Sequence, residues 1–416
     1  MVLDAVLKRL IRKGDLRVSD WKGDVRHYGD GGSPSVHIRF SSAAAARKIA
    51  LDPDLNLGEI YMDGSLSLVS GTIYDFLALA MQNLEHGGKS HWIHNIFHMG
   101  RVATRRMKQH NPVGKAKSNV AHHYDLSGKL YDLFLDVDRQ YSCAYFEAGN
   151  STLEEAQLAK KRHLAAKLNI RPGMRVLDIG SGWGGLGLYL AEVCGAEVTG
   201  VTLSEEQFTL SNERAQQRGI SGRAKFMLKD YRHLTEKFDR VVSVGMFEHV
   251  GVGHFPEFFA KVATLLKDDS AAVLHSINRS DGPGATSAWI QKYIFPGGYI
   301  PALSEVIPHM ERQGLYVTDV EILRLHYAET LRHWAIRFAD NRARAVELYD
   351  ERFCRMWEFY LAGSECAFRY GGMNNFQIQF GKNQHVLPMT RDYIFTEEDR
   401  LRKIERKTPL LRKVSG

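Results

Sequence analysis

The chain has 416 residues, 44% of them hydrophobic and 25% charged, which excludes disorder at scale and leaves room for two domains. Its four cysteines, Cys143, Cys194, Cys354 and Cys366, are widely spaced without a CxxC pair, so neither a metal site nor a disulfide framework is predicted, and a reducing cytoplasmic setting fits best. The net charge of +7 permits an anionic partner such as nucleic acid or acidic lipid, but equally a basic surface that is merely solvated.

The N-terminal segment MVLDAVLKRLIRKGDL mixes acids and bases with apolar residues, so it lacks the clean apolar core of a secretory signal peptide. No apolar run in the chain approaches the roughly 18 residues that a membrane-spanning helix needs. The segment is amphipathic and fits either a helix lying on a membrane or a helix packed on its own domain. Its apolar positions are Val2, Leu3, Val6, Leu7, Leu10 and Ile11, and its basic positions are Lys8, Arg9, Arg12 and Lys13.

Residues 1–85 combine strand-like runs (SVHIRF, GEIYMDGSLSL) with helical ones (AAAARKIAL, IYDFLALAMQNL), which predicts a small α+β domain associated with lipid or membrane. Residues 86–118 are basic and punctuated by Gly and Asn, and we interpret them as a linker. Four cations of this linker could meet anionic headgroups: Arg101, Arg105, Arg106 and Lys108.

Residues 119–416 form the predicted catalytic domain, in which strands and helices alternate. This alternation predicts a mostly parallel sheet wound on both faces, an α/β fold of the Rossmann-like class. The expected strands are MRVLDIG, AEVTGVTL, AKFMLK, FDRVVSVG, SAAVLHSI, LYVTDVEILRL and NNFQIQF; the expected helices are GGLGLYLAEV, SEEQFTLSNERAQQ and FPEFFAKVATLL, with later ones around TLRHWAIRFAD and RFCRMWEFYLAG.

The turn VLDIGSGWGG, residues 176–185, follows an apolar strand and precedes a helix, so its glycines would let the backbone approach a ligand at the helix N-terminus. Read as GxGxxG, it could be a dinucleotide fingerprint. Two features favour S-adenosylmethionine instead. Asp178 gives the spacing DxGxGxG typical of methyltransferases, and the second strand ends at Thr202 where a dinucleotide enzyme would carry an acid for the ribose. Asp230, after the third strand, is placed to meet an adenine edge.

The chain resembles the cyclopropane-fatty-acyl-phospholipid synthases and their relatives, the mycolic acid cyclopropane synthases. The resemblance covers most of residues 120–380 and rests on HHYDLSGKLYDLFLD, QYSCAYF, VLDIGSGWGG, GVTLSEEQ, VGMFEHVG, LHSI and FPGGYIP, with GEIYMDGSL in the N-terminal part. It implies a class I S-adenosylmethionine-dependent methyltransferase fold. It also implies transfer of a methylene unit to a cis double bond of an unsaturated phospholipid acyl chain, peripheral contact with the inner face of the membrane, and a homodimer.

The resemblance further implies a bicarbonate ion as proton acceptor, held by Cys143, Glu248, His275, the main chain of Ile277 and Tyr327. Glu248 and His275 both follow predicted strands at the carboxyl edge of the sheet, where open α/β sheets bind ligands. Each residue also has a structural alternative: a helix-start acid for Glu248, a core histidine for His275, a packing aromatic for Tyr327 and a small buried hydrophobe for Cys143.

The residues expected at the cofactor are Tyr141, Ser142, Asp178, Gly180, Gly182, Trp183, Gly184, Thr202, Leu203, Gln207, Asp230 and Tyr231. Aromatic residues expected to line an acyl slot are Phe146, Phe247, Tyr293, Phe295 and Tyr299, with core packing as the alternative for each. Cys143 is expected to be a neutral thiol, because a thiolate beside a methyl sulfonium would itself be methylated.

The sequence differs from the family pattern at two positions, and three other functions remain as alternatives. Ser181 stands where many members have cysteine, and Ser364 stands where relatives carry a later cysteine, with Cys366 two residues on. The closest rival reaction leaves a methylene- or methyl-branched acyl chain. A nucleic-acid methyltransferase is disfavoured, because GMFEHVG replaces the usual [DNS]PP[YFW] motif. A non-catalytic lipid carrier is the third rival. The sequence does not choose a double-bond position or a headgroup.

Overall fold

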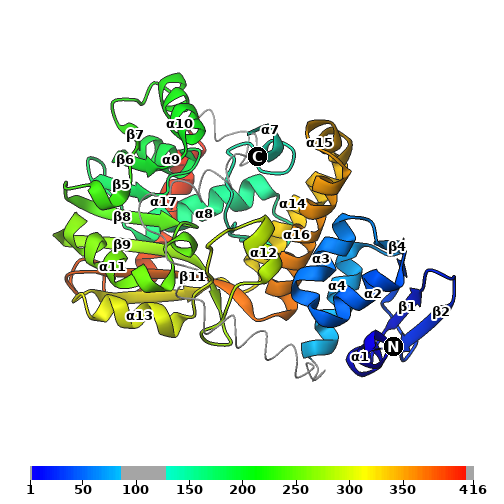
Figure 1. Ribbon diagram of the computed structural model, residues 1–416. Coiled ribbons are helices and arrows are strands. Elements are labelled where there is room, and N and C mark those ends of the chain that lie inside the picture. The colour runs from blue at the N-terminus through cyan, green and yellow to red at the C-terminus, as the bar shows by residue number, and fades with distance from the viewer. Residues whose placement is uncertain (1, 86–127, 409–416) are drawn as a thin grey trace. The chain divides into compact units, whose positions relative to one another are not determined.

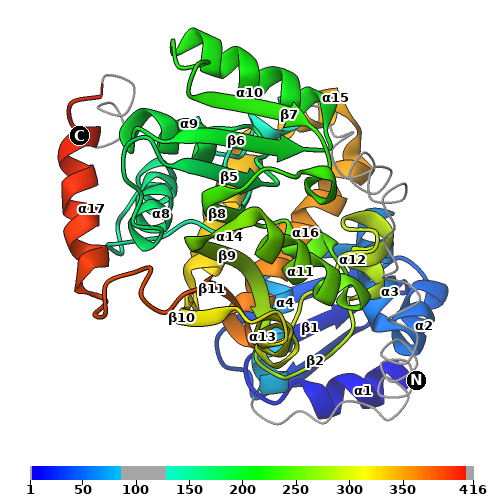
Figure 2. The same ribbon diagram turned by 90° about the vertical axis from the view of Figure 1, so that its left-hand side faces the viewer.

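The computed structural model describes residues 2–85 and 128–408 of the chain (Figures 1 and 2). The predicted basic linker, residues 86–118, lies outside the described residues. The chain divides into two compact units: Met1–Lys108 with Ala285–Pro296 and Leu331–Met373, and Gln109–Gly284 with Gly297–Thr330 and Asn374–Gly416. These units interleave along the chain, whereas the predicted domains are contiguous stretches, and the predicted boundaries stay predictions.

The first unit contains a four-stranded sheet in the order β2-β1-β3-β4. Strand β1 is antiparallel to β2 and parallel to β3, and β3 is antiparallel to β4. The strands are β1 (Asp15–Ser19), β2 (Val25–Gly29), β3 (Ser35–Phe40) and β4 (Leu66–Ser70). The helices are α1 (Val2–Leu10), α2 (Ala43–Leu51), α3 (Pro53–Met62), α4 (Ile73–Glu85), α12 (Ala288–Tyr293), α15 (Arg342–Leu348) and α16 (Glu351–Tyr370), and α14 (His326–Asp340) belongs to this unit from Leu331 on.

The expected strand at GEIYMDGSLSL is wrong in its first half, because Gly58–Met62 are the last turns of α3. Pro53 begins this helix, and the fixed φ of proline suits a first helical position. A Cβ at Gly58 would lie 2.3 Å from the indole nitrogen of Trp289, so the glycine permits a close contact with a residue far along the chain. Only Leu66–Ser70 is a strand.

The apolar face of α1 is occupied within the first unit. Leu3, Leu7 and Ile11 are buried in a core with Val18 and Tyr28. The four basic residues of the segment, Lys8, Arg9, Arg12 and Lys13, are exposed. Of the two alternatives for this helix, the structure therefore supports packing on its own unit, and any membrane contact would depend on the exposed cations.

The second unit is built on a seven-stranded sheet in the order β10-β11-β9-β8-β5-β6-β7. Strands β5 to β9 pair in parallel, and β10 pairs antiparallel with β11. The strands are β5 (Arg175–Ile179), β6 (Glu197–Thr202), β7 (Ala224–Leu228), β8 (Phe238–Val244), β9 (Leu266–Arg279), β10 (Tyr316–Ile322) and β11 (Met373–Gly381). This arrangement confirms the predicted mixed α/β fold with a central parallel sheet.

Helices cover both faces of this sheet with apolar side chains (Figures 1 and 2). One face packs against α8, α9 and α17, and the other against α11 and α13. The helices of the unit are α7 (Gly128–Tyr131), α8 (Leu153–Lys167), α9 (Gly185–Val193), α10 (Glu205–Gln217), α11 (Phe255–Leu265), α13 (Leu303–Glu311) and α17 (Asp392–Glu405). In the described part of the chain, no helix is long and apolar enough to cross a membrane.

Helix α8 buries a run of cationic residues. It begins with a capping box in which Thr152 and Glu155 satisfy each other's backbone donors. Two of its basic residues pair with carboxylates on α17: Arg162 donates to Glu405 at 2.8 Å, and His163 lies 2.6 Å from Glu398. Paired charges of this kind can be buried without the full cost of desolvation. Helix α17 therefore holds α8 in place.

Candidate functional site

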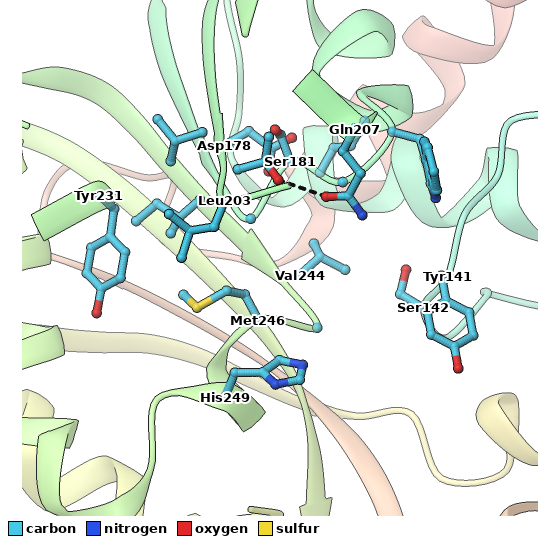
Figure 3. Close-up of a pocket in the computed structure, with 18 of the residues that line it drawn as sticks. Tyr141, Ser142, Asp178, Ser181, Leu203, Gln207, Tyr231, Val244, Met246 and His249 are labelled. Atoms are coloured by element: carbon cyan, nitrogen blue, oxygen red, sulfur yellow. Dashed lines mark hydrogen bonds between the residues drawn. The ribbon is translucent and has the colours of Figure 1, made fainter. Parts of the chain in front are cut away.

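A pocket lies in the second unit at the carboxyl ends of β5, β6, β7 and β8 (Figure 3). Its wall includes Gly180 and Trp183 after β5, Leu203 after β6, Tyr231 after β7 and Met246 after β8. The carboxyl edge of a parallel sheet is where open α/β folds bind ligands. The structure brings together every predicted cofactor residue except Gly184: Tyr141, Ser142, Asp178, Gly180, Gly182, Trp183, Thr202, Leu203, Gln207, Asp230 and Tyr231.

The glycine turn after β5 needs glycine for two different reasons. Gly182 has a φ of +53°, and a Cβ built there would meet no heavy atom within 4 Å, so the backbone is open to a ligand. Gly184 has a φ of +82° and is the N-cap residue of α9, but a Cβ built there would lie 2.7 Å from Ser211 Cβ. Gly184 thus serves close packing of the turn and does not line the pocket.

Asp178 ends β5 with its side chain buried in the pocket wall. Its Oδ2 has no hydrogen-bond partner among the described residues. Burial raises the pKa of Asp178 to about 7, against the opposing charge of Lys160. A buried acid in this state can accept a charged ammonium group, as the methionyl end of S-adenosylmethionine would provide.

Asp230 and Thr202 lie at the carboxyl ends of two neighbouring strands. The Asp230 carboxylate accepts from Arg232 Nη2 at 2.7 Å and from Arg232 Nε at 3.0 Å. Burial alone would raise the pKa of Asp230, but these hydrogen bonds outweigh it and lower the pKa, so the group stays ionised. Thr202 Oγ1 donates to Gln207 Oε1 at 2.8 Å. An ionised acceptor is thus available for an adenine edge.

The loop that carries Tyr141 and Ser142 is fixed to α8 by two side chains. Gln157 Nε2 donates to the carbonyls of Gln140 and Ser142 at 3.3 and 3.0 Å. Lys160 Nζ donates to Gln140 Oε1 at 2.8 Å and to Ser142 Oγ at 2.7 Å. Figure 3 shows Tyr141 and Ser142 facing the strand-end residues across the pocket. This clamp places the two residues as one wall of the site.

Several lining residues were not predicted from the sequence. His249 follows Glu248 in VGMFEHVG, and burial lowers its pKa to about 4, so its imidazole is neutral at pH 7. Gln140 begins the motif QYSCAYF, which could have drawn attention to it. Lys160 stands in AQLAKKRHLAAK, where nothing in the pattern separates a buried lysine from a solvated one. The others include Arg139, Met246, His254 and Glu257.

The five residues expected to hold bicarbonate are all in the second unit, but none of them lines this pocket. Glu248 lies in the short helix η2 (Phe247–His249), directly after pocket residues Gly245 and Met246. Its Oε1 accepts the backbone N–H of Ile277 at 2.7 Å, and its Oε2 is buried without a partner among the described residues. Burial raises the pKa of Glu248 to about 7, although the Ile277 hydrogen bond opposes this.

His275 lies on β9 two residues before Ile277, so both side chains point to the same face of the strand. Its two ring nitrogens lie 3.1 and 3.4 Å from the amide nitrogens of Gln377 and Asn375 on β11. Burial holds the pKa of His275 well below its usual value, so the ring is neutral. The structure thus gives His275 amide partners instead of a carboxylate.

Cys143 is fully buried, and its thiol donates to the carbonyl of Ala144 at 3.3 Å. Burial raises the pKa of this thiol far above its usual value, so it is neutral. Tyr327 is buried at the start of α14. The structure joins Glu248 to Ile277 directly, while shared anion binding by Cys143, His275 and Tyr327 stays a prediction.

The predicted acyl-slot aromatics fall in different places. Phe247 stacks on Phe255 at 4.4 Å within an apolar core, and Tyr299 donates its hydroxyl to Glu305 at 2.6 Å. The backbone N–H of Phe146 donates a hydrogen bond to His326 Nδ1 at 2.9 Å. Tyr293 and Phe295 belong to the first unit, where Tyr293 donates to Glu59 at 2.9 Å. Contact of these residues with an acyl chain stays a prediction.

Comparison with known proteins gives consistent matches. Residues 112–378 match the model of the mycolic acid cyclopropane synthetase family, and residues 2–89 match a domain of unknown function. A probable fatty acid methyltransferase of Pseudomonas putida is 34% identical over 91% of this chain and 96% of its own length. The cyclopropane-fatty-acyl-phospholipid synthase of Escherichia coli K12 is 35% identical over 84% and 89%. A mycolic acid cyclopropane synthase solved with S-adenosylhomocysteine and CTAB is 33% identical, with a TM-score of 0.60 over 65% of this chain and 99% of that chain.

Proposed function

Because the chain belongs to the mycolic acid cyclopropane synthetase family, we propose that it transfers a methylene unit from S-adenosylmethionine to a cis double bond of an unsaturated phospholipid acyl chain. Dependence on S-adenosylmethionine and methyltransferase activity are common to this family. The phospholipid acceptor and the ring product are the proposal. One observation carries it: Glu248, which is buried and accepts the N–H of Ile277, lies in the short helix that directly follows the pocket residues Gly245 and Met246.

The pocket suits S-adenosylmethionine, which supplies an electrophilic methyl group on a sulfonium when bound. Asp178 offers a buried acceptor for the ammonium of its methionyl end. Asp230 offers an ionised acceptor for its adenine edge. The open backbone at Gly182 leaves room for close approach, and Tyr141 with Ser142 closes the opposite wall.

The reaction needs a base but no redox partner. The π electrons of the double bond form a bond to the methyl carbon as the carbon–sulfur bond breaks, which leaves a carbocation on the acyl chain. Loss of a proton from the transferred carbon then provides the electron pair that closes the ring. The chain must accept this proton in a dry site. Glu248 is suited to hold the acceptor of this proton, because its Oε2 is buried without a partner among the described residues and burial raises its pKa to about 7.

Bicarbonate is compatible with the residues around Glu248, and its presence there is part of the proposal. When bound, it would supply a proton acceptor. A second anion beside an ionised Glu248 would be repelled, but burial raises the pKa of Glu248 to about 7, so this carboxyl can stay neutral and donate to the ion. Cys143, with its neutral thiol, and His275 and Tyr327 would complete the set. In this structure the backbone N–H of Ile277 donates its hydrogen bond to Glu248.

A branched product is the second candidate, since the relative that matches 91% of this chain is a probable fatty acid methyltransferase. Loss of a different proton from the same cation would give a methylene branch, which a reductase could convert to a methyl branch. The structure does not support a thiol nucleophile at the position of the family's later cysteine, for either route. Cys366 is buried in the core of the first unit, with its sulfur 3.9 Å from the carbonyl oxygen of Tyr74.

Lipid analysis of a host that expresses the protein tests the proposal. Unsaturated phospholipid acyl chains should gain about 14 mass units, one CH₂, and the products should resist catalytic hydrogenation. A product that takes up hydrogen would replace the cyclopropane assignment with the branched one. No mass gain on phospholipids, with a gain on free fatty acids or another acceptor, would overturn the phospholipid assignment.

A phospholipid substrate also requires contact with a membrane surface, and we include a peripheral location at the inner face of the membrane in the proposal. The exposed cations Lys8, Arg9, Arg12 and Lys13 support it, because each basic residue near an anionic surface contributes about 1 kcal/mol. A homodimer and the absence of nucleic-acid binding complete what the family resemblance implies. Sedimentation with anionic and with neutral vesicles, and light scattering, would test these points.

A further inference from the structure

Lys160 lies in the wall of the pocket with none of its side chain exposed. Its ammonium donates to Gln140 Oε1 at 2.8 Å and to Ser142 Oγ at 2.7 Å, and both of these partners are neutral. An ammonium has three N–H donors, so one remains after these two hydrogen bonds. A buried cation with only neutral partners is costly unless an anion approaches it.

The other buried cations of α8 provide an internal comparison. Lys161 donates to Asp138, Arg162 to Glu405, and Lys167 pairs with Glu321. His163 lies between Glu398 and Glu321. Among the described contacts of this helix, Lys160 is the buried cation whose hydrogen bonds go to uncharged groups alone. The lack of a carboxylate partner is therefore specific to Lys160 and is not general to the buried cations of α8.

The acids nearest to Lys160 are already engaged. Asp138 pairs with Lys161 and Arg214. Asp136 accepts the backbone N–H groups of Asp138 and Gln140, at 3.1 and 2.7 Å. Asp178 also lines the pocket, and its Oδ2 makes no hydrogen bond within the described residues. Lys160 and Asp178 thus line the same pocket as a buried cation and a buried acid that form no ion pair with each other.

We propose that Lys160 is the counter-charge for a carboxylate-type oxyanion in this pocket, and that this anion is the carboxylate of the cofactor's methionyl end. The methionyl end is a zwitterion, and its ammonium and carboxylate match Asp178 and Lys160 in charge. Lys160 would also couple cofactor binding to the wall of the site, because the same ammonium holds Ser142 and Gln140. The inference rests on cofactor binding by the family and is independent of which lipid product forms.

Bicarbonate is the other source of the same chemistry, because the charge of Lys160 also acts on Cys143 and His275. The cofactor carboxylate and bicarbonate can be distinguished by the choice of ligand. S-Adenosylhomocysteine carries the methionyl-type carboxylate, and 5′-methylthioadenosine is a matched ligand that lacks the whole amino-acid end. Bicarbonate can be varied on its own in carbon-dioxide-depleted buffer.

The test is calorimetric titration of the full chain and of Lys160→Met with both nucleosides. We expect Lys160→Met to weaken S-adenosylhomocysteine by about 10- to 100-fold, the range of a charge-assisted hydrogen bond, and to leave 5′-methylthioadenosine within about two-fold. Lys160→Arg should keep much of the preference for S-adenosylhomocysteine. Lys167→Met is the matched control, because it removes a buried α8 cation away from the pocket and should lower the melting temperature without changing the preference.

Each other outcome is also decisive. If S-adenosylhomocysteine binds Lys160→Met normally but more bicarbonate is needed for half-maximal turnover, the oxyanion is bicarbonate and the cofactor assignment is overturned. If both nucleosides weaken equally, or nothing changes, Lys160 is structural and the proposal fails. Should Lys160→Met not fold, the native protein and the methyl ester of S-adenosylhomocysteine give the answer: equal affinity for ester and acid would exclude any counter-charge for the carboxylate.

Discussion

Glu248 accepts the backbone N–H of Ile277 on one carboxylate oxygen at 2.7 Å and keeps the other oxygen buried without a partner among the described residues. One oxygen therefore fixes the orientation of the carboxyl, and the second is left for chemistry. A catalytic acid or base requires both a fixed orientation and an oxygen that can exchange a proton.

Glu248→Gln tests that assignment. The amide keeps the shape of the side chain but cannot exchange a proton with the bound ion, so turnover of unsaturated phospholipid vesicles should fall by about 10²- to 10⁴-fold. Affinity for S-adenosylhomocysteine should stay within about three-fold, because Glu248 does not line the pocket. The exposed acid Glu236 provides a matched control: Glu236→Gln should keep full turnover. Full activity in Glu248→Gln would remove this residue from the chemistry.

Cys143→Ser should reduce turnover only partly, by about 3- to 30-fold. The thiol is buried and neutral, and a hydroxyl of similar size keeps a donor at the same place. A nucleophile would behave differently, since its loss would abolish turnover and the protein would form a methylated or acylated adduct at Cys143. Steady-state kinetics and intact-protein mass spectrometry distinguish the two cases.

Asp178 should make cofactor binding depend on pH. Its pKa is raised to about 7, so the group is a neutral acid below that pH and a carboxylate above it. Only the carboxylate attracts the ligand's ammonium, so affinity for S-adenosylhomocysteine should rise between about pH 6 and about pH 7.5 and level off above. Binding at pH 6.5 should release protons to the buffer. Asp178→Asn should flatten the profile, and an unchanged slope in that variant would assign the effect to another group.

Gly182→Ala should weaken cofactor binding by about 10-fold or more, because the methyl group would enter the open side of the turn where the ligand approaches. Gly219 provides the control. Its φ is +67°, and like Gly182 it has no heavy atom within 4 Å of a built Cβ, but it does not line the pocket. Both alanine variants should lose about 1 kcal/mol of stability from backbone strain, yet only Gly182→Ala should lose affinity. Equal affinities would show that the turn is not in contact with the ligand.

The strands and the glycine turn could be predicted because their signals are local. Mostly apolar strands such as β5 lie inside the sheet, and residues at the ends of successive parallel strands meet at one edge. That geometry explains why so many predicted cofactor residues line one pocket. Which residues of each loop were expected at the cofactor followed from the family resemblance and not from a local sequence pattern.

The buried polar residues could not be predicted in the same way. Strand β11 was expected, but its alternation of amides and apolar residues would ordinarily place Asn375, Gln377 and Gln379 in solvent. All three are buried, and Gln377 contacts His275 across 102 positions of sequence. Lys160 is a similar case, since a lysine in a helical run is usually solvated. Such positions depend on partners that a local pattern does not contain.

The contacts between α8 and α17 also bear on when the protein can acquire its cofactor during synthesis. Helix α8 clamps the loop of Tyr141 and Ser142, and it is in turn held by Glu398 and Glu405, which lie 235 and 243 positions after their partners. A nascent chain that has not yet extended past Glu405 contains the glycine turn and α8 but lacks the complete α17, which holds α8 in place. Cofactor uptake is therefore expected to be a late event, which follows emergence of α17 from the ribosome.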